Sequence, residues 1–226
     1  MNPVIAVINE DPAQVTAAEA KSLVAALSQQ VTHLAAWYDV GGVTVVEFAP
    51  GKAPATAWWL VLLANADVAG ALGYHDLTPA GLPIGKCFVN TSLQDGVSWQ
   101  SCASHEFCEM LGDPWINLAA DPGNGSLLNA YELCDAVEQD SYKASNGVEL
   151  SNFVTPRWFI TGAKGPYDHL GLCKTPGELR PGGYMSQYTG GAWNQVYGAK
   201  GARDFRRPER GSRVERRRLN AALWKR

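Results

Sequence analysis

Residues 104–109 of this chain read Ser-His-Glu-Phe-Cys-Glu, and this stretch decides the fold that we expect. If residues 99–111 form a helix, His105 and Glu109 lie four positions apart and share one face, one turn above the other. At that spacing an imidazole nitrogen and a carboxylate oxygen can bind one metal ion, with Glu106 beside it. Hydrolytic zinc sites use such a helix, usually with a second histidine where this chain has Glu109.

The residues around the motif predict where its helix begins and ends. Ser98 or Ser101 can act as the N-cap, because a serine hydroxyl accepts a hydrogen bond from a free backbone N–H of the first turn. Gly112 ends the helix, and Pro114 prevents its continuation. We expect the motif to face away from the apolar side of the helix, which is formed by Ala103, Phe107, Met110 and Leu111.

A hydrolytic zinc site needs three protein ligands and one open position, so a third ligand must come from another part of the chain. Glu132, at the start of Glu-Leu-Cys-Asp over residues 132–135, is the first candidate. Asp113 is a rival, since a carboxylate just past the helix end can fold back. Asp135 can instead accept the second N–H of His105 and fix its tautomer.

The chemistry of a site with one histidine and two carboxylate ligands follows from the charges of these ligands. Glu106 would act as the general base that takes a proton from the attacking water. Two carboxylate ligands weaken the Lewis acidity of Zn²⁺ and shift preference toward harder ions such as Mn²⁺ or Ca²⁺. We therefore expect slower peptide hydrolysis than at a two-histidine site, or none. Tyr74 or His75 can donate to an oxyanion; the alternative is a loop tyrosine and histidine satisfied by backbone groups.

The remaining pattern predicts an α+β fold in which a mixed sheet is backed by one long helix, with the metal-motif helix beneath it. Asp11-Pro12 predicts the start of the long helix, which extends to about Tyr38. Runs of apolar and β-branched residues predict strands over 4–9, 43–48, 58–63 and 86–90, and a short helix is expected over 66–72.

We expect three regions along the chain. Residues 1–160 form the α+β domain, and residues 161–199 form an irregular extension packed on it, because they are rich in Gly, Pro and Tyr. Residues 200–226 form a basic tail. The tail has eleven Lys/Arg and three Asp/Glu, a net charge of +8, which leaves −11 on residues 1–199 for the whole-chain value of −3.

The basic tail has two interpretations. It is either a solvated segment or a surface that binds an acidic partner or nucleic acid. The candidate partner-binding residues are Arg206, Arg207, Arg210, Arg213, Arg216, Arg217 and Arg218.

Three further features of the sequence indicate the cellular location that we expect for the chain. The N-terminus lacks the basic region of a signal peptide, so we expect synthesis in the cytoplasm without one. The longest apolar run, residues 57–64, is too short to span a membrane. The five cysteines show no paired spacing, which favours buried, reduced thiols.

Several stretches together resemble a poorly characterised group of zincin-like (HExxE) metallopeptidase-type proteins found in bacteriophage, prophage and bacterial genomes. The resemblance covers roughly residues 70–160, and it is carried by residues 73–76, 81–83, 104–110, 112–114, 131–138 and 151–159. It implies a zincin-like core with a zinc site at His105, Glu109 and Glu132 or Asp135, but no substrate.

The chain departs from the related metzincin pattern at two positions. Gly112 falls where a glycine is expected, but Glu109 stands in place of the second histidine and Trp115 in place of the third. Two functions therefore remain open. The first is a zinc-dependent hydrolase, of peptidase or amidase type, carried as a virion component. The second is a structural virion protein with a catalytically degenerate zincin-like fold, whose basic tail docks on neighbouring subunits.

Overall fold

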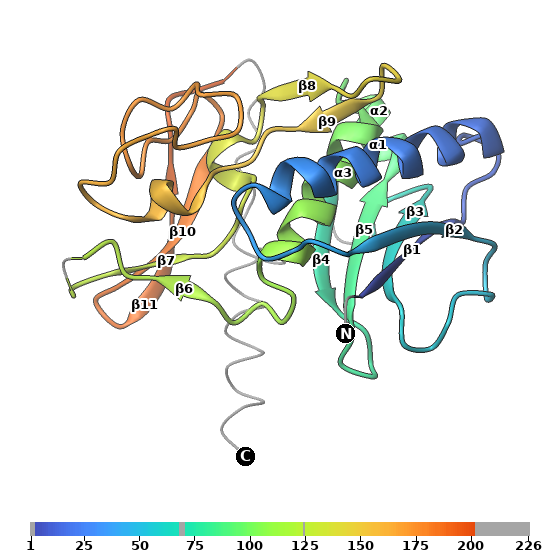
Figure 1. The fold of residues 1–226 in the computed structure, drawn as a ribbon, viewed down its shortest axis with the longest axis horizontal. Coiled ribbons are helices and arrows are strands. Elements are labelled where there is room, and N and C mark those ends of the chain that lie inside the picture. Colours follow the sequence, from blue (N-terminus) through green and yellow to red (C-terminus); the bar gives the residue numbers. More distant parts are fainter. Residues whose placement is uncertain (1–2, 68–70, 124, 202–226) are drawn as a thin grey trace. The chain divides into compact units, whose positions relative to one another are not determined.

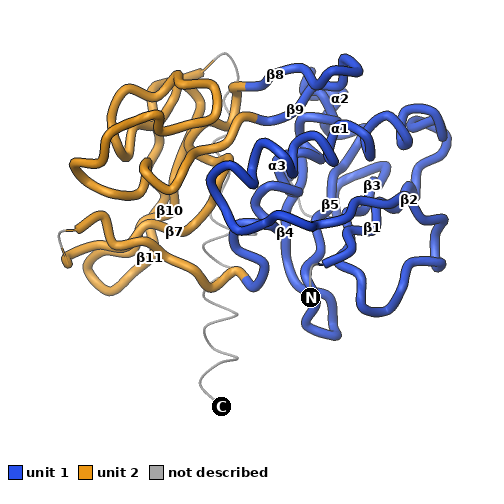
Figure 2. Tube along the Cα trace, in the orientation of Figure 1, with its two compact units in different colours: residues 1–115, 141–151 blue, residues 116–140, 152–226 orange. Residues whose placement is uncertain are grey.

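The computed structural model describes residues 3–67, 71–123 and 125–201, and the chain divides into two compact units (Figure 2). Unit 1 comprises Met1–Trp115 and Ser141–Ser151, and unit 2 comprises Ile116–Asp140 and Asn152–Arg226. The fold is α+β with few helices, as the sequence predicts. Of the helices in the described parts of the chain, none is long and apolar enough to cross a bilayer.

Unit 1 is built on a five-stranded mixed sheet (Figure 1). Its strand order is β2-β1-β3-β5-β4, so β2 and β4 are the edges. Neighbouring strands are parallel except β4, which runs antiparallel to β5. The strands are β1 (Val4–Asn9), β2 (Thr44–Phe48), β3 (Trp58–Leu63), β4 (Gly73–Leu77) and β5 (Pro83–Phe88).

Helix α1 (Ala17–Ala35) packs against β1, β2 and the second long helix of the unit (Figure 1). It begins later than predicted because Thr16, and not Asp11, is its N-cap. The Thr16 hydroxyl accepts a hydrogen bond from the backbone N–H of Glu19, whose carboxylate accepts one from the N–H of Thr16. This reciprocal capping box satisfies two N–H groups that would otherwise lack partners.

Helix α3 (Trp99–Gly112) carries the metal motif and packs on β4 and β5. Ser98 is its N-cap and accepts a hydrogen bond from the N–H of Ser101. A hairpin of β8 (Ser141–Lys143) and β9 (Glu149–Ser151) also packs on α3, through β9.

A buried polar network ties α3 to α1 and β9. The Ser104 hydroxyl exchanges hydrogen bonds with the side-chain amide of Gln30 at 2.9 and 3.1 Å and accepts one from the N–H of Ser151 at 2.8 Å. All three residues are at most 1% exposed. The network therefore anchors α3 at the residue directly before His105, the first of the two candidate ligands on this helix.

Unit 1 differs from the sequence-based expectation in three further places. Residues 73–77 form β4, where a loop was expected. The strand expected over 86–90 lies at 83–88, because helix α2 (Val89–Gln94) begins at residue 89. The helix expected over 66–72 is not present at residues 66, 67, 71 and 72, and residues 68–70 lie outside the described part.

Unit 2 contains an antiparallel sheet of order β11-β10-β7-β6. An irregular extension was expected over residues 161–199, yet residues 184–197 form a hairpin. The elements are β6 (Ala119–Ala120), β7 (Leu128–Ala130), the 3₁₀ helices η1 (Asp135–Val137) and η2 (Pro156–Phe159), β10 (Tyr184–Thr189) and β11 (Ala192–Tyr197). All seven candidate partner-binding arginines lie outside the described residues.

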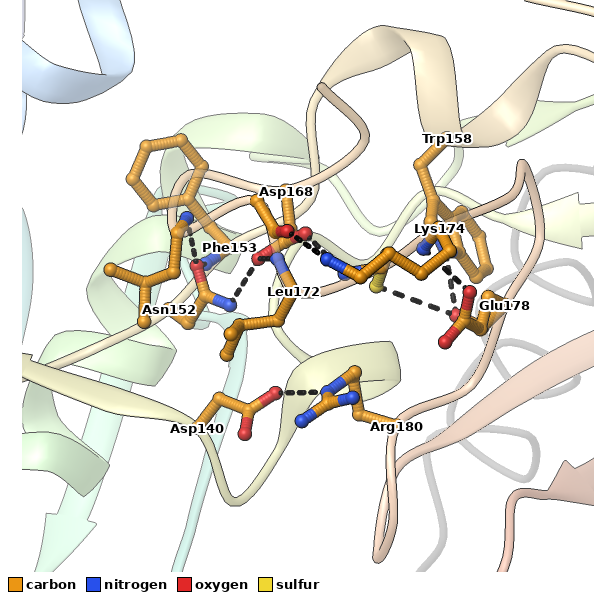
Figure 3. A network of polar contacts seen from close by, with 12 residues as sticks. Asp140, Asn152, Phe153, Trp158, Asp168, Leu172, Lys174, Glu178 and Arg180 are labelled. Carbon is orange, nitrogen blue, oxygen red and sulfur yellow. Dashed lines mark hydrogen bonds and ion pairs between the residues drawn. The ribbon is translucent and has the colours of Figure 1, made fainter. Parts of the chain in front are cut away.

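Polar side chains hold the loops of unit 2 in place of regular structure (Figure 3). The fully buried Asp168 carboxylate accepts hydrogen bonds from the Asn152 amide at 2.8 Å and from the backbone N–H of Cys173 at 2.7 Å. The Arg180 guanidinium donates to Asp140 at 2.9 Å, which raises the pKa of Arg180. These contacts explain how residues 161–183 are ordered without helices or strands.

Candidate metal centre

Helix α3 presents three buried ionisable side chains. His105, Glu106 and Glu109 are 6%, 3% and 0% exposed. The Nε2 atom of His105 lies 3.0 Å from Oε1 of Glu109, as the spacing of four residues predicts. The motif side of α3 is therefore as buried as its apolar side, whereas an amphipathic helix was expected.

Strand β4 adds a second imidazole. His75 is 1% exposed, and its Nδ1 atom lies 3.4 Å from Oε2 of Glu109 and 4.0 Å from Oε2 of Glu106. The Glu109 carboxylate therefore lies between two rings that come from different elements. His75 was expected in a loop, either as an oxyanion donor or satisfied by backbone groups, and its place on β4 corrects the loop assignment.

Two glycines allow α3 to approach this strand pair closely. His75 pairs with Gly85 in the antiparallel register of β4 and β5, and Gly73 lies two residues before His75 on the same face. A Cβ atom at Gly73 would lie 2.8 Å from Oε1 of Glu106 and 2.7 Å from the carbonyl oxygen of Lys86. Since real Cβ contacts are longer, only glycine at this position leaves room for the carboxylate.

The geometry of both pairs suits metal binding. Two ligand atoms at about 2.1 Å from a tetrahedral ion lie about 3.4 Å apart. The separations of 3.4 Å from His75 and 3.0 Å from His105 to the two Glu109 oxygens are close to this value. His75 and His105 each belong, together with Glu109, to a group of three buried side chains that could hold an ion. Buried charges are normally paired or coordinate a metal.

Tyr74 lies on the opposite face of β4 from His75, because side chains alternate along a strand. Its hydroxyl donates to Asp67 at 2.9 Å and accepts from Lys86 at 2.7 Å. Burial lowers the pKa of Lys86, but its hydrogen bonds to Asp67 and Tyr74 outweigh this and leave the pKa raised. The Tyr74 hydroxyl is therefore engaged with Asp67 and Lys86.

The candidate third ligands lie in three different places. Glu132 follows β7 and Asp135 begins η1; both are buried, and both belong to unit 2. Their role as ligands of an ion on α3 stays a prediction. Asp113 is fully buried at the C-cap of α3, where its backbone N–H donates to the carbonyl of Glu109 at 2.8 Å.

No family model matches the chain, and neither a curated protein nor a solved structure matches it. The resemblance to zincin-like proteins therefore stays a prediction. The candidate functional site is the buried cluster of His75, His105, Glu106 and Glu109, which we call the α3–β4 cluster.

Proposed function

We propose that this protein binds a divalent metal ion, zinc in the first instance, and hydrolyses peptide or amide bonds. The observation that supports this most is the fully buried Glu109 carboxylate, whose oxygens lie 3.0 and 3.4 Å from two imidazole nitrogens. The proposal includes a zincin-like core, with Glu132 or Asp135 as a further ligand. Mn²⁺ and Ca²⁺ are the other candidate ions, because carboxylate ligands favour harder cations.

The residues of the α3–β4 cluster have distinct roles in this proposal. A bound ion would polarise the scissile carbonyl and acidify water. Glu106 would act as the general base: it takes a proton from the attacking water and delivers it to the leaving amine. Its position supports this role, since its Oε2 atom lies 4.0 Å from Nδ1 of His75, beside the residues that would hold the ion.

A second proposal is favoured by the charge of the chain. The net charge of +8 over residues 200–226 suits a segment that docks on acidic surfaces or nucleic acid. In this proposal the protein is a structural component of a virion, and the metal acts only as a scaffold. The two proposals share the metal and differ in catalysis.

Comparison of the wild type with Glu106→Gln separates them. Both proteins are assayed for metal content by mass spectrometry and for hydrolysis of a peptide library, with the exposed Glu47→Gln as a control of equal charge change. The hydrolase proposal expects equal metal content in all three and activity lost only in Glu106→Gln. Bound metal with no activity in the wild type would favour the scaffold.

A further inference from the structure

We propose that Glu109 bridges two metal ions, one held with His75 and the other with His105. This inference rests on the proposed metal binding, and it adds a second ion that neither the spacing of the motif nor the resemblance implies. It also names the class of centre: a dinuclear, carboxylate-bridged site.

The first support is the way the Glu109 carboxylate is shared. Its Oε2 atom faces Nδ1 of His75 at 3.4 Å, and its Oε1 atom faces Nε2 of His105 at 3.0 Å. Each oxygen therefore has its own imidazole. The two oxygens of one carboxylate can each bind a different ion, and ions bridged in this way lie about 3.5–4 Å apart in two-metal hydrolytic sites.

The second support is the origin of the two rings. His105 lies on α3, one turn before Glu109, and His75 lies on β4. The Ser104 network anchors α3, and β4 is anchored by its pairing with β5. Both rings are also buried, so each is supplied by an anchored element and packed among other side chains.

The third support is the chemistry of the substitution at residue 109. A neutral imidazole has one lone pair and binds one ion, whereas a carboxylate has two oxygens and can bridge. Single-ion hydrolytic sites usually have a histidine at the position of Glu109. A glutamate there weakens a mononuclear site, but it allows the residue to bridge two ions in a dinuclear site. Glu106, 4.0 Å from Nδ1 of His75, stays available as the base.

Metal stoichiometry tests the inference directly. The full chain is stripped by chelation and titrated with Zn²⁺ and with Mn²⁺, and bound metal is measured by mass spectrometry and calorimetry. We expect about two ions per chain in the wild type and about one in His75→Ala and in His105→Ala. His33→Ala, which removes a histidine of α1, should retain two. Thermal unfolding of each variant verifies that it is folded.

Electron paramagnetic resonance of the Mn²⁺-loaded protein tests the bridge itself. Two ions that share Glu109 should give an exchange-coupled spectrum in the wild type, which becomes that of an isolated ion in His75→Ala. Two ions without coupling would overturn the bridge. One ion in the wild type would overturn the second site and leave the proposed function standing, whereas no bound ion would overturn both.

Discussion

The Nδ1 atom of His75, on the edge strand β4, lies 3.4 Å from Oε2 of Glu109, in the last turn of the metal-motif helix α3. This contact joins a strand to a helix 34 positions further along the chain (109 − 75). It places a second imidazole beside a motif that has only one. The close approach of α3 to β4 makes the contact possible, and it leads to the first prediction.

Gly73→Ala should destabilise unit 1 and displace Glu106. The new Cβ atom would lie 2.7 Å from the Lys86 carbonyl oxygen and 2.8 Å from Oε1 of Glu106, and a backbone atom cannot move aside easily. We expect the free energy of unfolding to fall by about 1–3 kcal/mol, as for other overpacked sites. Urea unfolding measures the change.

Gly85→Ala is the matched control for Gly73→Ala. Its nearest contact would be 3.1 Å to Cδ1 of Leu60, a side-chain atom that can yield. The loss should therefore be smaller than at Gly73. Equal losses in the two variants would contradict a specific requirement for glycine at residue 73.

Ser104→Ala should remove the buried network that links α3 to α1 and β9. The Gln30 side chain and the backbone N–H of Ser151 would each lose a hydrogen bond without access to water. A buried polar group left unsatisfied costs about 1–3 kcal/mol, which denaturant unfolding resolves. Ser28→Ala, on the exposed side of α1, should change stability by less than about 0.5 kcal/mol. Similar losses in both variants would contradict a central role for Ser104.

The cysteines should be unreactive in the folded protein. All five are buried and free of disulfides. Burial raises the pKa of the Cys87 thiol well above its usual value and contributes most to raising the pKa of Cys173 to about 12. Since the thiolate is the reactive form, iodoacetamide at pH 8 should label the native chain slowly and label five thiols after unfolding. Rapid native labelling, or fewer than five thiols in the unfolded chain, would contradict this.

Mild acid should weaken the contact between α1 and the β8–β9 hairpin. His33 packs against Tyr142, with Nδ1 2.9 Å from the tyrosine hydroxyl, and burial lowers the pKa of His33 below its ordinary 6.5. The unfolded chain therefore binds the proton more readily. The contribution of the neutral His33 ring to stability is complete above pH 6.5, and it is lost as the pH falls through the lowered pKa of His33.

Urea unfolding at pH 7.5 and pH 5.5 tests the role of His33. The wild type should lose more stability over this interval than His33→Gln, because the variant has no titrating ring at residue 33. An equal pH dependence in the two proteins would assign the acid sensitivity to other groups.

The sequence predicted the elements whose signal is local. The apolar runs of β1 and β3 and the capped helix around His105 fall where expected, because burial pattern and capping residues specify them. The i,i+4 contact between His105 and Glu109 follows from helix geometry alone.

The elements that were missed depend on partners distant in the chain. Gly73 to Leu77 forms a strand because it pairs with β5, although Tyr-His-Asp within it has the composition of a loop. The ligand role that we propose for His75 was not predicted for the same reason, since it depends on the face of the strand on which the ring lies. The signal in the sequence that could have predicted this strand is the Gly-x-His alternation over residues 73–75, close to the apolar strand β5. The hairpin over 184–197 was not predicted, because glycines flank its strands and form the turn between them.

The metal content of the purified protein tests the central claim most directly. Wild type and Glu109→Ala are dialysed against metal-free buffer and analysed by mass spectrometry, with thermal unfolding to verify that both are folded. We predict tightly bound divalent metal in the wild type and its loss in the variant. Equal metal content in the two proteins, or none in either, would contradict a metal centre at the α3–β4 cluster.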